Sequence, residues 1–176
     1  LIAQAGAISP PAAPGFLPYL APGEQGALWN ADLYGTIFGL RLGHGAAELA
    51  RGLLNGIVLE SRRCVEVLAD AGLPAGEIRI AGWCASDAGV CRDLADCCRR
   101  PVRIVTGDWN DGSAIGAARL LAAALGQELA QGAAGIEVAP DERRARVWDG
   151  LWERHERMRE AATVIYEPRE ASCMEK

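Results

Sequence analysis

One stretch of the chain, residues 78–126, constrains the fold more than any other. It begins with a β-like run, Ile78–Ile80, and passes through a turn of small residues into a helical run that ends near Arg99. A second β-like run, Val102–Val105, leads into another turn and another helical run. This β-α-β-α order indicates an α/β fold, in which ligands gather at the carboxyl ends of the strands. The turn around Gly82, where a backbone can closely approach a bound group, is therefore the first candidate site.

The size and composition of the chain favour a single globular domain. Its 176 residues allow a core of ordinary size, and half of them are hydrophobic while 23% are charged, which argues against disorder. The net charge is −5, and the concentration of basic residues between Arg143 and Arg159 has Asp and Glu interspersed. Nucleic-acid binding is therefore not expected. The first residue is Leu1 rather than Met, which suggests part of a longer protein.

No apolar run approaches the roughly 20 residues that span a bilayer, and the first residues lack the basic region of a signal peptide. We therefore expect a cytoplasmic protein with no membrane partner. Its cysteines form no CxxC pair and are too sparse for a disulfide scaffold, so reduced and mostly buried thiols are expected, with a zinc site as the minor alternative. The six cysteines are Cys64, Cys84, Cys91, Cys97, Cys98 and Cys173.

Little regular structure is expected in the first forty residues. Prolines within residues 1–22 argue against a helix, and Phe16–Leu20 is expected to lie extended against the core. Glycines recur through residues 29–40, which predicts turns rather than regular structure. Residues 127–140 are likewise expected to form a loop.

A long amphipathic helix is predicted over residues 45–71, with Gly72 as its stop. Gly52 and Gly56 lie within it, and because glycine is unfavourable in a helix, they suggest unusually close packing against a neighbour. The side chains expected on its inner face are Ala46, Leu49, Leu53, Ile57, Cys64, Val65 and Leu68. Those expected on its other faces are Glu48, Arg51, Asn55, Arg62, Arg63 and Glu66.

Three further helices are predicted. The first spans residues 87–99 and ends before a proline. The second spans about residues 114–124, with N-capping groups at residues 111–113, and should be largely buried because it carries only one charge, Arg119. The last runs from Asp141 to about Ala162. The expected inner faces are Val90, Leu94, Cys97 and Cys98 in the first helix, and Val147, Leu151, Trp152, His155 and Met158 in the last.

Familiar catalytic motifs are absent from the chain. It contains no GxGxxG or GxxxxGK[ST] sequence, so neither a dinucleotide site nor a P-loop has motif support. No Ser lies in a GxSxG setting, and the two histidines, His44 and His155, are far apart in sequence. His44 precedes a helix, where a capping or packing role is expected. Taken alone, the turn of residues 82–85 is also consistent with a tight strand-to-helix connection.

The order and spacing of several blocks, however, resemble the C-terminal domain of the FGGY carbohydrate kinases, the family that contains xylulokinase, ribulokinase and glycerol kinase. The first block resembles the family's Leu-Pro-Tyr-Leu-x-Gly-Glu-Arg sequence, the next two its second signature, and the fourth stands where the family has Gly-Gly-Gly-Ala-x-Ser. The resemblance covers about Gly15 to Arg159, and the ordered series is more specific than any one block. The blocks are Phe16–Leu20 with Gly23–Glu24, Gly35–Leu40, Glu48–Leu49 with Leu53–Gly56, Ile80–Asp87, Leu94–Asp96, Arg100–Val102 and Ser113–Ala118.

This resemblance implies an α/β domain of the ribonuclease-H-like, actin/hexokinase class, here incomplete and dominated by helices. Residues 1–162 would form part of the kinase C-terminal domain, and residues 163–176 a C-terminal tail. The implied reaction transfers the γ-phosphoryl group of ATP to a sugar or polyol hydroxyl, with a pentulose such as xylulose favoured. ATP and Mg²⁺ are the implied cofactors, a small sugar is the implied partner, and a homodimer is left open.

The resemblance also implies which part of the kinase this chain contributes. The family's catalytic Asp and phosphate loop lie in an N-terminal domain that is absent here, so no catalytic or metal-binding residue is expected, and Mg²⁺ would be bound mainly by that domain. The expected nucleotide-binding wall consists of Gly82, Trp83, Cys84, Ala85 and Asp87. Asp87 would lie beside adenine, where its carboxylate could accept from the exocyclic amine but would repel phosphate.

Several positions depart from the family pattern. Trp83 and Cys84 replace two of three glycines, so Trp83 would either stack on adenine or partly fill the pocket. Gln25 stands in place of an Arg, while Gly52 and Asn55 depart from the second signature. Two alternatives therefore stay open: a non-catalytic or degenerate nucleotide-binding or interaction module of the same fold and, less favoured, an unrelated cofactor-binding α/β enzyme.

Overall fold

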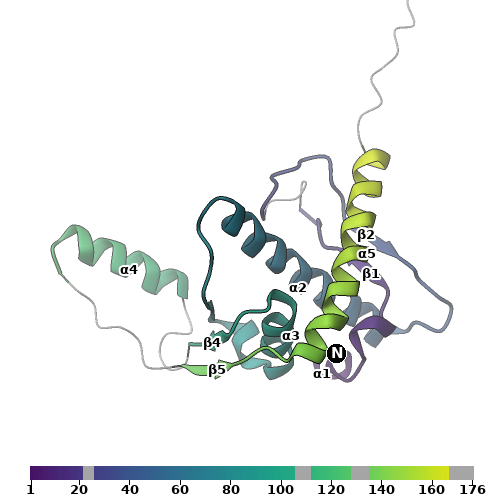
Figure 1. Cartoon of the computed structure of the whole chain (residues 1–176), viewed down its shortest axis with the longest axis horizontal. Coiled ribbons are helices and arrows are strands. Elements are labelled where there is room, and N and C mark those ends of the chain that lie inside the picture. Colours follow the sequence, from purple (N-terminus) through teal and green to yellow (C-terminus); the bar gives the residue numbers. More distant parts are fainter. Residues whose placement is uncertain (22–25, 106–111, 128–134, 167–176) are drawn as a thin grey trace, which may run out of the picture.

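The computed structural model describes residues 1–21, 26–105, 112–127 and 135–166, apart from the side chains of residues 83, 84, 112 and 113. Helices dominate this part of the chain, and two small sheets lie among them (Figure 1). Of the expected capping residues, position 111 falls outside what is described, while Gly112 and Ser113 already belong to the next helix, α4 (Gly112–Ala124). Of the expected tail, residues 163–166 continue the last helix, α5 (Glu142–Tyr166), and residues 167–176 fall outside what is described.

The two small sheets come from different parts of the chain. In the first, β1 (Gly15–Leu17) pairs antiparallel with β2 (Thr36–Phe38). In the second, β3 (Ile78–Ile80) and β4 (Val102–Ile104) run parallel, and β5 (Ile136–Val138) pairs antiparallel with β4. The β-α-β order of β3 and β4 is thus confirmed. Strands β2 and β5 correct the expectation of turns at 29–40 and a loop at 127–140, because strand pairing outweighs the local turn signals.

Three helices form the body of the protein: α2 (Ala46–Asp70), α3 (Ala88–Cys98) and α5 (Glu142–Tyr166). Helix α3 packs between α2 and α5, and its termini follow from its sequence. It begins after the capping residue Asp87 and ends at Arg99, which adopts a left-handed conformation ahead of Pro101. The core between the three helices consists of Val58, Leu59, Cys97, Trp148 and Leu151, with Trp152 packed against it.

Gly52 and Gly56 confirm the expected close packing of α2. A Cβ atom at Gly52 would lie 2.6 Å from the backbone oxygen of Pro14, and one at Gly56 would lie 2.5 Å from that of Phe16. Only glycine leaves room for the segment around β1 to cross the helix at this distance. The glycine side of α2 is therefore the side that faces the protein interior.

This buried side of α2 is not the one expected from its apolar side chains, and that prediction is wrong. Arg51, Asn55 and Arg63 share the glycine side and are buried there. Their polar groups are tolerated because they have partners: for example, Asn55 Nδ2 donates to the backbone oxygen of Pro10 at 2.9 Å. The expected inner-face residues that are exposed instead are Leu49, Ile57 and Leu68.

Helix α4 (Gly112–Ala124) exists as predicted, but it is not buried. Figure 1 shows it well away from α2, α3 and α5. Leu120, Leu121 and Leu125 are 76%, 62% and 66% exposed. The expectation of a largely buried helix is therefore wrong for this chain, since nothing within the described residues covers its apolar surface.

The proline-rich start of the chain also differs from expectation, because it contains helical turns. Helix α1 spans Ile2–Gly6, and a 3₁₀ turn, η1, spans Pro10–Ala12. Two prolines open η1, where their fixed φ fits a first turn and their missing N–H groups are not needed. The extended stretch after it is confirmed, with Leu17 and Tyr19 buried.

Two further findings concern the thiols and the membrane. Cys91, Cys97 and Cys98 are buried free thiols and Cys64 is partly buried, as expected for four of the six cysteines. Within the described residues, no helix is both long enough and apolar enough to span a bilayer.

Candidate functional site

The expected nucleotide turn lies directly beyond the carboxyl end of β3. The register pairs Ile80 with Ile104, and Val105 donates its backbone N–H to the Ile80 oxygen at 2.9 Å, so the ends of the two parallel strands stay together. The chain then bends at Gly82, whose φ of 80° lies in the left-handed region that favours glycine. A 3₁₀ turn, η2 (Trp83–Ser86), follows, and Ala85 donates its N–H to the Gly82 oxygen at 3.1 Å.

Asp87 has a well-defined structural role at the end of this turn. Its Oδ1 accepts from the backbone N–H groups of Gly89 at 2.8 Å and Val90 at 3.0 Å, so it caps the N-terminus of α3. Because this carboxylate already satisfies the first donors of α3 and adds a negative charge, the helix N-terminus is a poor place for a phosphate. That Asp87 repels phosphate and lies beside adenine stays a prediction.

The remaining wall residues are only partly defined. Gly82 and Ala85 are half-buried, and Cys91 Sγ approaches the Ala85 oxygen at 3.8 Å, which anchors the turn on α3. The side chains of Trp83 and Cys84 lie outside the described part, so whether Trp83 stacks on a base or fills the pocket stays a prediction. The structure thus brings the backbone of all five predicted residues together in one turn between β3 and α3.

Away from the turn, a cluster of charged side chains joins α2, α3 and α5. Asp93 accepts from Arg51 Nη2 at 2.6 Å and from Arg144 Nη2 at 2.7 Å. Asp96 is fully buried and accepts from Arg144 Nε and from the backbone N–H of Asp141. Burial raises the pKa of Asp93, while the two arginines act in the opposite direction. The apolar pattern of α2 predicted that Arg51 faces solvent, so this cluster was not predicted from the sequence. The signal that could have revealed it is the spacing of Asp93 and Asp96, which places two carboxylates on the inner face of α3.

A second buried network surrounds Glu60 of α2. Its Oε1 accepts from the Tyr19 hydroxyl at 2.9 Å and lies 2.7 Å from Nε2 of His155, and its Oε2 accepts from Arg63 Nε at 3.1 Å. Arg63 also pairs with Glu156 of α5. Burial opposes ionisation of Glu60, but the hydrogen bonds from His155 and Arg63 prevail and lower its pKa to about 2. His155 is therefore a polar link between α2 and α5 rather than an apolar contact.

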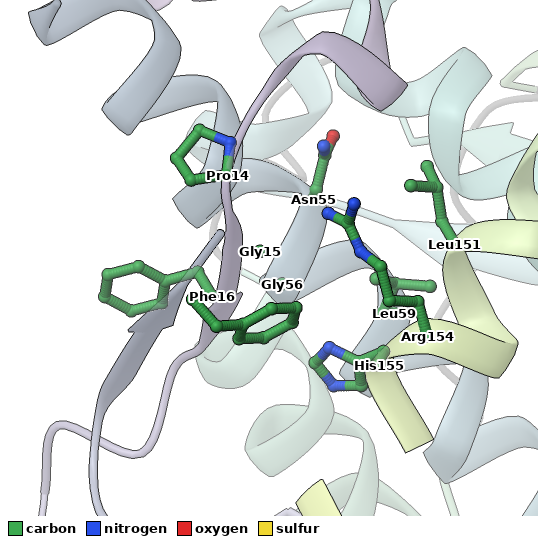
Figure 2. A pocket seen from close by; sticks show the side chains of 10 residues that line it. Pro14, Gly15, Phe16, Asn55, Gly56, Leu59, Leu151, Arg154 and His155 are labelled. Carbon is green, nitrogen blue, oxygen red and sulfur yellow. The ribbon is translucent and has the colours of Figure 1, made fainter. Parts of the chain in front are cut away.

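Close to this network lies a small cavity between β1, α2 and α5, with Phe16, Gly56 and His155 in its lining. Figure 2 shows Arg154 and His155 of α5 across from Pro14. Its volume of about 10 Å³ holds roughly one water molecule. It is therefore too small for a substrate or a nucleotide.

His44 has the local role that the sequence predicts. Its Nδ1 accepts from the backbone N–H of Arg41 at 3.1 Å, which closes the turn before α2. Across the described residues, no group of three or more His, Cys, Asp or Glu side chains is arranged to hold a metal ion.

Comparison with known proteins places this geometry in a family. The chain matches the model of the C-terminal domain of the FGGY family of carbohydrate kinases over residues 1–125. It is 33% identical over 112 residues to a glycerol kinase of Burkholderia cenocepacia, and equally to one of Chromobacterium violaceum; each match covers 61% of this chain and 22% of the relative. The chain therefore spans about a fifth of the length of these relatives.

Solved structures agree on the fold. A xylulose kinase from Rhodospirillum rubrum superposes with a TM-score of 0.75 at 26% identity, over 94% of this chain and 34% of that one. A gluconate kinase from Lactobacillus acidophilus superposes with a TM-score of 0.77 over the same shares, and its 22% identity shows the fold alone. The expected fold class, a helix-dominated part of an actin/hexokinase-like domain, is confirmed. Because the family model covers well over half of the chain, the protein belongs to the FGGY family of carbohydrate kinases, as part of their C-terminal domain.

Proposed function

We propose that this chain supplies the nucleotide-binding wall of a carbohydrate kinase that transfers the γ-phosphoryl group of ATP to a sugar or polyol hydroxyl. The observation that carries the proposal is the turn at Gly82. It follows a strand that runs parallel to its neighbour, at the strand end where α/β folds bind ligands. The sequence resemblance supports the proposal, because it aligns this turn with the family's glycine-rich block.

The chemistry of the turn fits the adenosine end of ATP. Gly82 has no side chain and adopts a positive φ, so the backbone presents itself to a ligand without steric cost. Asp87 keeps the N-terminus of α3 occupied and negatively charged, which favours a base over a phosphate beside it. In this proposal Gly82 and Ala85 contact the nucleotide through their backbone. The side chains of Trp83, Cys84 and Asp87 line the space around the base.

The residues of this chain would orient the nucleotide but would not carry out the transfer. ATP, when bound, supplies the phosphoryl group. Since the described residues offer no metal-binding group, Mg²⁺ would be held by the nucleotide phosphates and by parts of the kinase outside this chain. The catalytic Asp would likewise lie outside it.

For the acceptor we favour a pentulose such as xylulose. Support comes from the similarity to the Rhodospirillum rubrum enzyme, whose fold this chain shares over 94% of its length. The glycerol kinases, at 33% identity over a shorter stretch, make glycerol the principal competitor. Because ATP is the proposed donor, we also propose that the protein works in the cytoplasm.

An activity assay on the whole gene product tests the proposal. The purified protein would be given ATP, Mg²⁺ and a panel of pentuloses, aldonates, tetritols and glycerol, and ADP release would be followed through a coupled assay. We expect ADP release that depends on one class of acceptor. Failure of every acceptor would refute an active kinase.

A second candidate is a non-catalytic nucleotide-binding or interaction module of the same fold. It is favoured by the bulk of Trp83 and Cys84, which replace glycines of the family block. Titration with ADP tests nucleotide binding separately from catalysis. Thermal stabilisation by ADP, together with no turnover in the activity assay, would indicate a module that binds the nucleotide without catalysis. No change in Trp fluorescence and no thermal shift would exclude the nucleotide wall itself, and a Trp83→Phe variant would attribute any fluorescence change to this one of five tryptophans.

A further inference from the structure

A polar hollow of about 360 Å³ lies between the start of the chain and helices α2, α3 and α5. We call it the arginine hollow. Its lining includes the segment 6–10, Arg51 of α2, Arg92 and Asp93 of α3, and Arg144 of α5. Arginines from three different helices thus converge on one space.

Positive charge exceeds negative charge in this lining. Arg51 and Arg144 share the single carboxylate of Asp93. Arg144 has a second partner in Asp96, but Arg92 makes no ion pair or hydrogen bond with any residue that the structure describes. Within the lining itself three guanidinium groups face one carboxylate, so the lining carries an excess positive charge, while Asp96 and Asp141 act on Arg144 from outside it.

Arg51 carries the stronger indication that an acceptor belongs here. It is only 4% exposed, and its one hydrogen bond within the described residues runs from Nη2 to Asp93. Its Nε is also without a partner, but that atom is fully enclosed, so a ligand in the hollow would meet the other N–H groups of this guanidinium. An unsatisfied N–H on a buried charged group is costly, so such groups normally have an acceptor.

We propose that the arginine hollow binds the phosphoryl group of a small molecule through Arg51 and Arg92. Guanidinium groups match phosphate oxygens with paired, charge-assisted hydrogen bonds. The volume lies in the range of small-molecule sites and exceeds that of a bare phosphate, so the group belongs to a larger ligand. Gly89, in the first turn of α3, also lines the hollow. The phosphoryl group belongs either to the nucleotide or to a separate phosphorylated molecule.

Titration with inorganic phosphate tests this site without any need for kinase activity. Binding would be measured by calorimetry at low ionic strength on the wild type and on Arg92→Gln. Arg92 is exposed, so its substitution should leave the fold intact, which circular dichroism would verify. We expect saturable binding that Arg92→Gln weakens roughly tenfold, as for one charge-assisted hydrogen bond.

Arg157→Gln is the matched control. Arg157 is also exposed and lies on α5, about 20 Å along the helix from Arg144, so this variant removes the same charge away from the hollow. Its phosphate affinity should equal that of the wild type. The proposal is overturned if phosphate does not bind saturably, or if both variants bind as the wild type does or weaken equally.

A competition arm identifies the source of the phosphoryl group. If ADP displaces phosphate, and Arg92→Gln weakens ADP as well, the hollow holds part of the nucleotide. If ADP binds while phosphate stays in place, the hollow serves a separate phosphorylated ligand. If the wild type binds phosphate saturably but does not bind ADP, the proposed nucleotide wall is contradicted and the proposal for the arginine hollow still holds.

Discussion

Gly82 is the residue at which backbone geometry and the proposed function depend most directly on each other. Its φ of 80° directs the chain from β3 into η2 with a backbone conformation that L-amino acids rarely adopt. The same bend presents backbone rather than side chain at the strand end. A substitution here should therefore affect both folding and nucleotide binding.

The first prediction is that Gly82→Ala lowers the free energy of unfolding by about 1–2 kcal/mol, the cost of a left-handed conformation for a residue with a Cβ atom. ADP affinity should fall as well, because Ala is strained at this φ and the turn would shift its backbone to relieve that strain. Gly76→Ala is the control: no atom lies within 4 Å of an added Cβ there, and its φ is ordinary. Urea unfolding and ADP titration of both variants check this. Equal stability of the two would show that the turn imposes no constraint.

Glu60 gives the second prediction at this scale, because hydrogen bonds to His155 and Arg63 lower its folded pKa from 4.5 to about 2. The unfolded chain therefore takes up this proton at a higher pH than the folded chain. The stability that Glu60 contributes is complete above about pH 4.5 and is lost as the pH falls towards 2. Its size is about 3 kcal/mol at most.

Unfolding measured between pH 6 and pH 2.5 tests this sign. Glu60→Gln should lower the stability near pH 6 and flatten its decline below about pH 4.5. Glu160→Gln, which alters an exposed carboxylate of α5, should keep the wild-type profile. A Glu60→Gln profile parallel to that of the wild type would mean that Glu60 is not ionised in the network.

Among the elements, α2 shows most clearly what sequence patterns can and cannot predict. Its extent, its stop at Gly72 and the close packing at Gly52 and Gly56 all follow from local rules of helix formation. The face that α2 buries does not follow from these rules, because a prediction from apolar periodicity assumes that polar side chains face solvent. Arg51 and Arg63 contradict that assumption, since Arg51 pairs with a carboxylate of α3 and Arg63 pairs with one of α5 as well as with Glu60 of its own helix.

The position of the turn that forms the candidate site could be predicted for a different reason, while its binding role stays a prediction. The turn of residues 82–87 lies between a strand and a helix with clear local signals, and Asp87 is a favoured capping residue. The strands β2 and β5 could not be foreseen as easily, because each is three residues long and exists through pairing with a distant strand. Short pairings of this kind depend on tertiary contacts rather than on local propensity.

The contact between α2 and β1 supports the third prediction. Gly56→Ala would place a Cβ atom 2.5 Å from a backbone oxygen that cannot move without shifting the strand. We expect a loss of about 1–3 kcal/mol from overpacking, partly offset by the better helix propensity of Ala. Gly150→Ala in α5, where an added Cβ meets nothing within 4 Å, should instead gain up to about 1 kcal/mol. Thermal unfolding of the pair measures the contrast, and a stabilised Gly56→Ala would disprove the close contact.

At the scale of the whole molecule, the exposed apolar surfaces are the main departure from an ordinary globular domain. Leu120 and Leu121 of α4, and Leu125 directly after it, are each more than half exposed, and Leu49, Ile57 and Leu68 of α2 are exposed as well. The chain spans 34% of the Rhodospirillum rubrum kinase. The sequence predicts that these apolar side chains are buried, but in this chain they are exposed. This is expected if other parts of a kinase cover them. The expectation that α4 is buried failed because burial depends on tertiary contacts, which the count of charged residues in one helix does not reveal.

The last prediction follows from this reading of α4. In the 176-residue chain alone, Leu121→Ser should change the free energy of unfolding by less than about 0.5 kcal/mol, because the side chain is already 62% exposed. In a polypeptide that includes the rest of the kinase, the same substitution should cost about 2 kcal/mol or more, as for an apolar side chain lost from a core. Ala123→Ser, at an exposed position two residues after Leu121 in α4, controls for the helix propensity of serine in both settings. Urea unfolding of the four variants decides the matter: equal costs in both settings would mean that the leucine face of α4 stays in solvent, and its apolar character would then need an intermolecular partner.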